Sequence, residues 1–469
     1  MALVINRAKK EGTTNVERNQ ETFPLLNDVE QSNIKVYKKR WYMLSLFFLL
    51  SVGQGIIYNT WSPIQSTARA VYKWDDFMID LMPALGCVGP CLTIVPLGWL
   101  MDVKGLRTAV LLAAGFQFFG SALRCIPTGG DWLISTILIC FGQALGCLTA
   151  PIPLSGPVLL SATWFPSNER TTATSILMAG SFAGFALSFI IGPLFVDDVG
   201  SISYSQLNST EREFYYRQIR TMFLVESIAM GLLFLAVIIY YPARPPQPPS
   251  RSSGVERMDT KSGIIKLLKN HSFVLLAILY GASCGVYSGW VSVLDQLLEG
   301  FGVGQKFAGW LGFIAVVSGA SSGIFFSIFA DRFSGHLKQF LLIFMACATF
   351  SILIVCFIFS KVIAFNKALI CVMFGLTGFF VNGALPFFFE LGAEMAYPVA
   401  EGLTSSVIKF TDYSLQAIFL IVSMGHFGGT WMTWVILVTI SATTILLTCV
   451  RERYNRLNID NFPTRPTED

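Results

Sequence analysis

Hydrophobic and polar residues occur along the chain in long alternating blocks. Apolar runs lie at 41–61, 77–101, 107–126, 132–160, 172–196 and 219–241, and again at 271–294, 305–330, 338–360, 367–392, 403–425 and 430–450. About 20 consecutive apolar residues cross the hydrocarbon core of a bilayer as a helix. The pattern therefore predicts an all-α membrane protein with twelve transmembrane helices, numbered spans 1 to 12.

A polar break separates the first six spans from the last six. Residues 242–270 contain prolines at 242, 245, 246, 248 and 249, followed by several basic residues. Proline cannot continue a helix, and the charges keep the segment in water. We therefore predict a tail at 1–40, an N-terminal half at 41–241, a linker at 242–270, a C-terminal half at 271–450 and a tail at 451–469.

Composition agrees with this pattern and excludes several function classes. The 469 residues are 53% hydrophobic and 13% charged, with a net charge of +4, whereas soluble domains carry about 25% charged residues. The basic residues form no single block, so nucleic-acid binding is not expected. The ten cysteines lie in or beside apolar runs, and no phosphate-binding loop, nucleophile elbow or zinc helix occurs. We expect no enzyme activity, no cofactor and no metal.

Basic residues predict the orientation, because Lys and Arg are enriched on the cytosolic side of membrane proteins. With a cytosolic N-terminus, most of them fall in the tails, the linker and the loops on that side. The first 32 residues lack the apolar core of a cleaved signal peptide. The sequon at Asn208 then lies on the opposite side, where N-glycosylation occurs. Both termini are expected to be cytosolic.

The loop after span 2 carries a family motif. Residues 98–107, GWLMDVKGLR, resemble the signature loop between helices 2 and 3 of the major facilitator superfamily, and residues 330–335 are a degraded copy after span 8. The aspartate in this loop can pair with a basic residue or with the N-terminus of a neighbouring helix. Two copies at matched positions predict two related halves. The loop residues concerned are Asp102, Lys104, Gly105, Arg107, Asp331 and Arg332.

A narrower resemblance covers most of the chain. Residues 59–65, 164–170 and 390–402 resemble solute carrier family 49, which includes the feline leukemia virus subgroup C receptor transporters. Residues 241–250 and 289–295 are similar to one branch of that family. The resemblance to this branch implies a lysosomal carrier that exports pyridoxine, a form of vitamin B6, together with protons.

The N-terminal tail contains a candidate sorting signal, ETFPLL at residues 21–26. An acidic residue, a three-residue spacer and two leucines form a signal that clathrin adaptors bind as an extended peptide with pockets for the leucines. We therefore expect Glu21, Leu25 and Leu26 to bind a clathrin adaptor and to direct the protein to the lysosomal membrane.

Charged side chains inside spans are candidates for proton coupling or gating, because charges are costly in hydrocarbon. Glu226 in span 6 is either a proton carrier or a carboxylate hydrogen-bonded to a neighbouring helix. Glu390 and Glu394 share one helix face at the cytosolic end of span 10, where we expect gating or anchoring against basic loops. Lys409 and Asp412 in span 11 form either an internal ion pair or part of the solute path.

Spans 1, 4, 7 and 10 supply broken helices to the central cavity of this superfamily, and here they carry aromatic and polar residues. A flat pyridine ring can stack on such aromatics while amides and hydroxyls bind its substituents, and a quaternary ammonium can face the same rings. The candidates, with Asp295 at the lumenal mouth, are Tyr58, Asn59, Trp61, Gln65, Gln143, Ser283, Tyr287, Ser288, Trp290, Asn382 and Tyr413. Interhelical hydrogen bonds are the alternative for Gln143, Asn382 and Tyr413, and an interfacial position is the alternative for Trp61 and Trp290.

In the choline-carrying relatives, an aromatic residue on span 1 and another on span 7 enclose the ligand. By this resemblance Tyr58 occupies the first position, whereas Ser288, flanked by Tyr287, falls at the second. The departure favours a different ligand.

We therefore predict a proton-coupled secondary carrier that exports a small organic solute, pyridoxine, from the lysosome to the cytosol by alternating access. Two alternatives stay open. One is a uniporter for choline, ethanolamine or another amine, and the other is a sensor or receptor that binds a ligand without transporting it.

Overall fold

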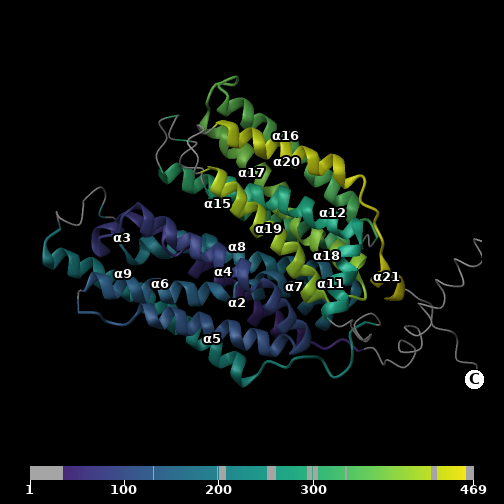
Figure 1. Cartoon of the computed structure of the whole chain (residues 1–469), viewed down its shortest axis with the longest axis horizontal. Coiled ribbons are helices and arrows are strands. Elements are labelled where there is room, and N and C mark those ends of the chain that lie inside the picture. The colour runs from purple at the N-terminus through teal and green to yellow at the C-terminus, as the bar shows by residue number, and fades with distance from the viewer. Residues whose placement is uncertain are drawn as a thin grey trace, which may run out of the picture.

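The structure, a computed structural model, describes residues 35–129, 131–197, 199, 207–250, 260–292, 298, 301, 305–332, 335–423 and 430–460. These residues form helices and connecting segments, with no strand among them. Figure 1 shows two helical bundles, one purple to teal and the other green to yellow, whose ribbons approach each other near α7, α11 and α18 and diverge toward α3.

The N-terminal half contains the first eight described helices. They are α2 (Arg40–Asn59), α3 (Gln65–Tyr72), α4 (Asp76–Val103), α5 (Leu106–Arg124), α6 (Trp132–Leu148), α7 (Pro151–Trp164), α8 (Arg170–Phe195) and α9 (Ser209–Ile239), with 3-10 turns at Ser62–Ile64 and Ser167–Glu169.

The C-terminal half follows a connecting helix, α11 (Thr260–Lys269), and ends before a short helix, α21 (Asn455–Asp460). Its elements are α12 (His271–Tyr280), a π-helical turn at Gly281–Gly285, α13 (Val286–Ser292), α15 (Gln305–Arg332), α16 (Leu337–Phe359), α17 (Lys367–Gly383), α18 (Leu385–Ala396), α19 (Glu401–Ser423) and α20 (Thr430–Leu447). We call the end of the molecule that carries α11 and α21 the linker end, and the end that carries α3 the far end.

The predicted spans 1, 4, 7 and 10 are all interrupted. Span 1 passes from α2 into a 3-10 turn, span 4 divides into α6 and α7, span 7 contains the π-helical turn, and span 10 divides into α17 and α18. Proline stands in the first turn of both α7 and α18. A proline is tolerated there because the first N–H groups of a helix have no partner within it. Each half therefore has two broken helices at matching positions.

The helices have the length and polarity of membrane spans. Among the described residues, nine helical segments are long and apolar enough to cross a bilayer, and Val88–Val103 and Trp431–Leu447 are shorter apolar helices. The helix α19, at the position of span 11, carries three charged residues: Glu401, Lys409 and Asp412. The chain is thus a multi-pass membrane protein, while the number twelve stays a prediction.

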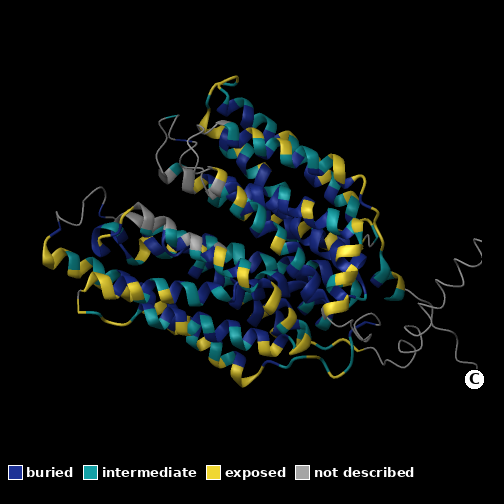
Figure 2. Cartoon of the chain, in the orientation of Figure 1, coloured by how far each residue is buried: buried dark blue, intermediate teal, exposed yellow. Residues whose placement is uncertain are grey.

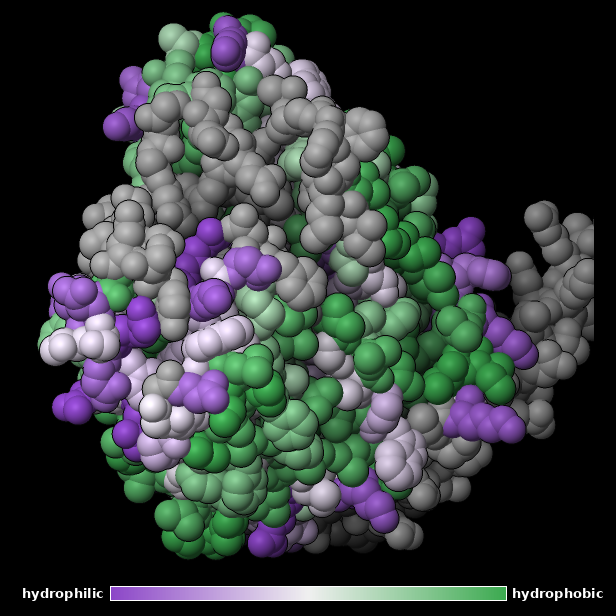
Figure 3. Space-filling view, turned by 60° about the vertical axis from the view of Figure 1, so that its left-hand side comes forward, coloured by the Kyte–Doolittle hydropathy of each residue, from purple (hydrophilic) through white to green (hydrophobic). Residues whose placement is uncertain are grey.

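Burial agrees with a lipid environment. Figure 2 shows buried residues inside each bundle and exposed ones on the outer helix faces. Large apolar side chains are exposed on these faces, including Leu92 at 75%, Phe350 at 66% and Ile239 at 79%. In Figure 3, hydrophobic surface covers much of the lower and right-hand part of the visible face, and hydrophilic residues gather mainly on its left and at its margins. Exposed apolar surface on this scale fits contact with lipid.

Two segments differ from the sequence-based expectation. The second part of the predicted linker forms α11, in which Gly263 and Leu267 lie four residues apart on the buried face and Gly263 packs near Leu403 and Val399. This spacing is the helical period, which the prolines of residues 242–249 obscured. The predicted C-terminal tail is also partly ordered, because α21 packs against α18.

The contact between α15 and α17 generates a stability prediction. A Cβ atom on Gly378 would lie 2.2 Å from the backbone oxygen of Ala315. Gly378→Ala therefore forces these helices apart and should lower the free energy of unfolding by about 1–3 kcal/mol, as overpacking does. The control is Gly312→Ala on α15, where the nearest atom lies 4.0 Å away. Unfolding in SDS titrations checks both variants, and equal stabilities would contradict the prediction.

Candidate functional site

Asp102 joins the two halves at the linker end. It lies near the end of α4, and its carboxylate oxygens accept hydrogen bonds from the backbone N–H groups of Gly402 (3.0 Å) and Leu403 (2.6 Å). Both groups belong to the first turn of α19, where N–H groups have no partner within the helix and the helix dipole is positive. The sequence left two partners open for Asp102, a basic residue or the N-terminus of a neighbouring helix. In the structure, Asp102 binds a helix N-terminus.

Asp331 makes the same contact in the opposite direction. It lies near the end of α15, and its oxygens accept hydrogen bonds from the backbone N–H groups of Thr171 (3.0 Å) and Thr172 (2.8 Å) at the start of α8. The short loops that follow both aspartates turn at glycines with positive φ, Gly105 (88°) and Gly335 (94°). Each half therefore caps one helix of the other, and we call these contacts the paired caps.

Other polar groups extend the contact between the halves. The Thr174 hydroxyl on α8 donates a hydrogen bond to Glu390 Oε1 on α18 (2.6 Å), and the Ser405 hydroxyl on α19 donates one to the Ser155 carbonyl on α7 (2.8 Å). Together with the paired caps, these bonds close the linker end of the molecule. By contrast, the motif residues Lys104, Arg107 and Arg332 are exposed.

Glu390 and Glu394 bind an arginine that the sequence did not point to. Arg456 on α21 donates from Nη2 to Glu390 Oε2 (2.5 Å) and from Nε to Glu394 Oε1 (3.0 Å). Burial alone would lower the pKa of Arg456, but the carboxylates of Glu394, Glu390 and Glu401 raise it above its ordinary value. Both glutamates thus contact the C-terminal segment, and Glu390 also contacts the N-terminal half through Thr174.

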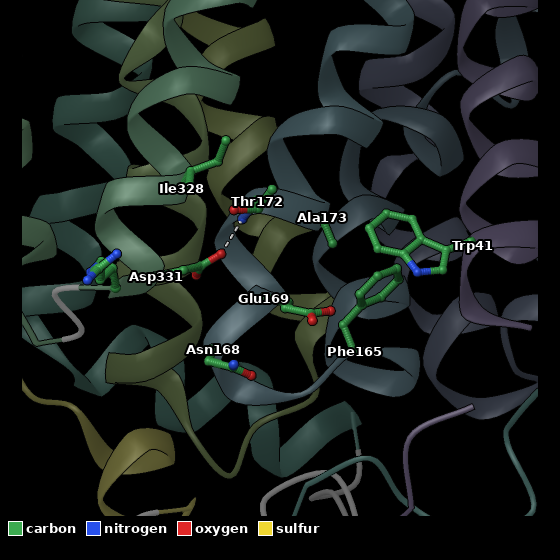
Figure 4. A pocket seen from close by; sticks show the side chains of 9 residues that line it. Trp41, Phe165, Asn168, Glu169, Thr172, Ala173, Ile328 and Asp331 are labelled. Carbon is green, nitrogen blue, oxygen red and sulfur yellow. Dashed lines mark hydrogen bonds between the residues drawn. The ribbon is translucent and has the colours of Figure 1, made fainter. Parts of the chain in front are cut away.

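A pocket of about 490 Å³ opens beside the cap that Asp331 forms on α8. Figure 4 shows Trp41 and Phe165 on one side of it, Ile328 and Asp331 on the other, and the hydrogen bond from the Thr172 backbone to Asp331. This pocket opens at the linker end, where the halves meet, and its lining contains none of the residues predicted to bind a solute. We do not assign the solute site to it.

Charged and aromatic residues meet farther along α19. The Lys409 ammonium lies 2.6 Å from Asp412 Oδ2, with the side chains 15% and 3% exposed. The same ammonium lies 5.3 Å from the ring centroid of Tyr413 and 5.7 Å from that of Tyr280, whose hydroxyl is 3.4 Å away. Lys409 is four residues beyond Ser405, which contacts the N-terminal half. Helical periodicity therefore places Lys409 on the face of α19 that points toward the other half, next to the closed end.

The π-helical turn of span 7 packs against the part of α19 that carries these residues. A Cβ atom on Gly285 would lie 2.5 Å from the Asp412 carbonyl, and one on Gly281 would lie 2.6 Å from the Thr411 carbonyl. The Thr411 hydroxyl also donates to the Ala277 carbonyl on α12 (2.6 Å). Single π turns frequently occur at functional sites. The residues Lys409, Asp412, Tyr280 and Tyr413 are called the α19 cluster below.

Several predicted solute-binding residues form a network inside the N-terminal half instead. Arg124 on α5 forms a buried ion pair with Glu226 on α9, and Arg124 also donates to Gln143 Oε1 (3.3 Å). Trp61 Nε1 donates to the same oxygen (3.3 Å), and Gln143 Nε2 donates to the Ile57 carbonyl (2.9 Å). Gln143 is fully buried and Trp61 is 5% exposed. The polar atoms of Trp61 and Gln143 thus bind within this half, and Gln143 makes the interhelical hydrogen bonds that are its predicted alternative to a solute contact.

The predicted residues of the C-terminal half are also largely internal. Trp290 is fully buried and stacks on Phe374, with ring centroids 5.0 Å apart, and Tyr287 is 3% exposed. Ser283 Oγ donates to the Leu279 carbonyl (2.8 Å) of its own helix, and Asn382 Nδ2 donates to the Ala315 carbonyl (3.4 Å). Trp290 and Tyr287 thus lie in the core of the C-terminal half.

The remaining candidates are placed as follows. Tyr58 is half-buried beside Phe185, Ser288 is half-buried, and Asn59 Nδ2 donates to Ser188 Oγ (2.7 Å). Asn208 is exposed at the start of α9, at the far end. Glu21, Leu25, Leu26 and Asp295 lie outside the described residues, and so does the side chain of Gln65.

Sequence reasoning missed Arg124, Tyr280 and Arg456. Arg124 is a charge at the end of an apolar run, so the cost of charge in hydrocarbon was an available signal. Tyr280 lies in an apolar stretch, and Arg456 lies in a polar tail about 60 residues from its partners. No local pattern connects either of them to the groups that they contact.

Comparisons with known proteins agree with this architecture. The family described as the Major Facilitator Superfamily matches residues 43–420. The chain is 35% identical to the solute carrier family 49 member 4 homolog of Xenopus laevis, over 94% of this chain and 97% of that protein. It is 27% identical to the choline/ethanolamine transporter flvcr2b of Danio rerio, over 92% and 90%, and 28% identical to the choline/ethanolamine transporter FLVCR1 of Mus musculus, over 82% and 70%.

Solved structures show the same fold at low sequence identity. The fucose:proton symporter FucP of E. coli aligns with a TM-score of 0.66 at 14% identity, covering 88% of this chain and 98% of that chain. The proton:xylose symporter XylE aligns with a TM-score of 0.68 at 13% identity, covering 89% and 98%. These likenesses concern the fold alone.

The Arg124–Glu226 pair generates a second stability prediction. Its side chains are 0% and 6% exposed, so Glu226→Ala leaves a buried guanidinium without its carboxylate. Breaking such a pair costs about 3–5 kcal/mol of unfolding free energy. Glu213→Ala is the control on the same helix, because the Glu213–Arg217 pair is 47% and 75% exposed and is worth about 0–1 kcal/mol. Unfolding in SDS measures both, and similar losses in the two variants would refute the structural role of Glu226.

Proposed function

The chain belongs to solute carrier family 49 of the major facilitator superfamily, and from this premise we propose that it exports pyridoxine from the lysosome, driven by protons. Members of the superfamily are transporters of small solutes and not enzymes. The observation that carries the proposal is the closed linker end, where the paired caps join two halves with matching broken helices. In the proposal, this end faces the cytosol and opens when the halves tilt.

The chemistry of the paired caps supports reversible opening. Each cap consists of a carboxylate and two backbone N–H groups at a helix start, so water can replace both partners when the halves separate. No covalent bond breaks, and no side chain has to leave a hydrocarbon core. The Thr174–Glu390 and Ser405–Ser155 contacts are likewise single hydrogen bonds between polar groups, which can break when the halves tilt. The closed end can therefore alternate with an open one.

The α19 cluster is the proposed solute and proton site. Lys409 lies next to the closed end, and the Tyr413 ring beside it offers a flat surface for a pyridine ring. Pyridoxine carries hydroxyl groups that can accept a hydrogen bond from Lys409 or donate one to Asp412. Tyr58, half-buried on span 1, is the candidate contact from the N-terminal half.

Asp412 is the proposed coupling group, rather than Glu226. When Asp412 takes a proton from the acidic lumen, its ion pair with Lys409 is lost and the ammonium is released toward the solute. Deprotonation on the neutral cytosolic side restores the pair and displaces the solute. The charged or titratable groups around Asp412 are Lys409, Tyr280, Cys284 and Tyr413. Glu226 is enclosed with Arg124 and Gln143 in one half, away from this path.

The choice of pyridoxine and of the lysosome rests on the sequence. The chain is 35% identical to a member 4 homolog and 27% identical to a choline/ethanolamine transporter. This difference supports the branch of the family for which the resemblance implies pyridoxine as the solute. The tail motif at Glu21, Leu25 and Leu26 supports adaptor-mediated sorting, and cytosolic termini agree with the basic residues of the linker and tails.

A choline or ethanolamine uniporter is the second candidate, because several relatives carry that name. The α19 cluster argues against it, since the Lys409 ammonium already lies against the rings of Tyr413 and Tyr280. A quaternary ammonium binds by the same cation–π attraction. It would have to compete with a fixed positive charge for these two rings.

Uptake at the cell surface tests the substrate and the coupling. A variant with Leu25→Ala and Leu26→Ala should reach the plasma membrane, so that the lumenal side faces the medium. We expect acidic medium to stimulate uptake of labelled pyridoxine several-fold and to leave choline uptake at background. Choline uptake that does not change with pH would establish the uniporter instead. Purified protein that binds a ligand but shows no flux in proteoliposomes would establish a sensor.

A second measurement separates the two carboxylates. Asp412→Asn should reduce the ratio of uptake at acidic pH to uptake at neutral pH to about one, because the amide cannot exchange a proton. Glu226→Gln is the matched control and should retain the ratio, whatever it does to expression. Loss of pH dependence in Glu226→Gln alone would move the coupling site to Arg124–Glu226.

A further inference from the structure

The short helix α21 contacts both halves at the linker end. Toward the C-terminal half, Arg456 binds Glu390 and Glu394 on α18, at 2.5 and 3.0 Å. Toward the N-terminal half, Asp460 Oδ2 lies 3.1 Å from Nη1 of Arg170 at the start of α8. Arg456 and Asp460 are four residues apart, so they lie on the same side of one helical turn. A segment of six residues thus spans the boundary between the halves.

The attachment to the C-terminal half is the stronger of the two. Arg456 is 2% exposed, and its backbone N–H and that of Leu457 both donate to Glu394 Oε2, each at 3.0 Å. With the two guanidinium contacts, four interactions fix α21 to α18. Charge-assisted bonds of this kind are roughly twice as strong as neutral ones. We therefore expect α21 to remain on the C-terminal half when the halves separate.

The attachment to the N-terminal half includes a buried ion pair. The side chains of Arg170 and Asp460 are each 3% exposed, so water screens their attraction little. Arg170 also donates to the Ser250 hydroxyl of the linker. Arg170 directly precedes Thr171 and Thr172, whose N–H groups bind Asp331. Any motion that uncaps α8 therefore also pulls Arg170 away from Asp460.

We propose that α21 is a latch for the linker end, in which Arg456 and Asp460 are positioning residues for the transport cycle. Arg456 fixes the segment to Glu390 and Glu394, and Asp460 holds Arg170 of the other half. The closed state is favoured by the Arg170–Asp460 pair, which has to break before the linker end opens. This inference rests on the proposed alternating-access function.

Arg456 has a second role in the same state. Glu390 and Glu394 lie one turn apart on α18, and Glu401 lies 4.0 Å from Arg456 as well. Three carboxylates this close repel one another unless a cation lies among them. Arg456 supplies that cation at one carboxylate oxygen of Glu390, and the other oxygen accepts the hydrogen bond from Thr174 of the N-terminal half. The latch therefore also supports a direct contact between the halves.

The test measures the distance between the halves and does not depend on solute flux. Labels carried by unnatural amino acids at Arg107 and His336, which are exposed at the linker end of opposite halves, report that distance in nanodiscs. Asp460→Asn leaves the contacts of Arg456 with Glu390 and Glu394 in place and weakens the ion pair with Arg170. A chain ending at Tyr454 removes the whole latch. Arg453→Gln is the control, because Arg453 is exposed in the same segment.

We expect Asp460→Asn to raise the ratio of open to closed linker ends about fivefold or more, which is the lower end of typical coupling between sites. The shortened chain should raise this ratio further. Arg453→Gln should match the unmodified protein. Arg170→Gln should raise the ratio as much as Asp460→Asn does, and the double variant should raise it little further than either single variant. A general loss of stability would instead make the two effects add. If Asp460→Asn does not fold, Arg170→Gln tests the same pair.

Unchanged distances in Asp460→Asn or Arg170→Gln and in the shortened chain would overturn the latch, and an equal shift in Arg453→Gln would do the same. A failure of pyridoxine flux would leave these distances as they are. The latch and the proposed substrate can therefore fail separately.

Discussion

The arrangement of the two halves depends on one kind of interaction, a carboxylate that caps the N-terminus of a helix in the other half. Asp102 does this for α19 and Asp331 for α8. Because each half provides both a carboxylate and a helix start, neither can tilt away from the linker end without uncapping two helices. The positions of Lys409 and Thr174 follow from these capped helix starts. Lys409 lies about two turns beyond the capped start of α19, and Thr174 reaches Glu390 from the second turn of α8.

Three of the ion pairs in the described part of the chain differ in their surroundings, and this difference distinguishes enclosed charges from accessible ones. Arg124 and Glu226 are enclosed within one half, with exposures of 0% and 6%. Arg456 and Glu390 are just as buried but lie where two halves and a terminal segment meet. In contrast, Lys409 retains 15% exposure beside two aromatic rings. A pair that water or solute can reach exchanges partners at low cost, whereas an enclosed pair does not.

The sequence predicted the features that depend on local pattern. Apolar runs located the helices, and the motif loops located Asp102 and Asp331 because helix ends and turns have local signatures. It did not predict features that depend on tertiary packing. Trp61 donates a hydrogen bond within one half, Trp290 stacks inside the other, and α11 forms in the segment predicted to be a linker. Residues suited to a solute site are equally suited to a buried hydrogen bond, and sequence spacing does not distinguish the two.

The position of Arg456 along the chain also affects how the protein is made. Glu390 and Glu394 are synthesised about sixty residues before the cation that neutralises them in the folded protein. While the ribosome is still adding α19 and α20, span 10 therefore enters the membrane with two neighbouring carboxylates at its end and no arginine between them. The final packing of this end has to wait until α21 has left the ribosome, so the two halves meet in their closed form only late in biosynthesis.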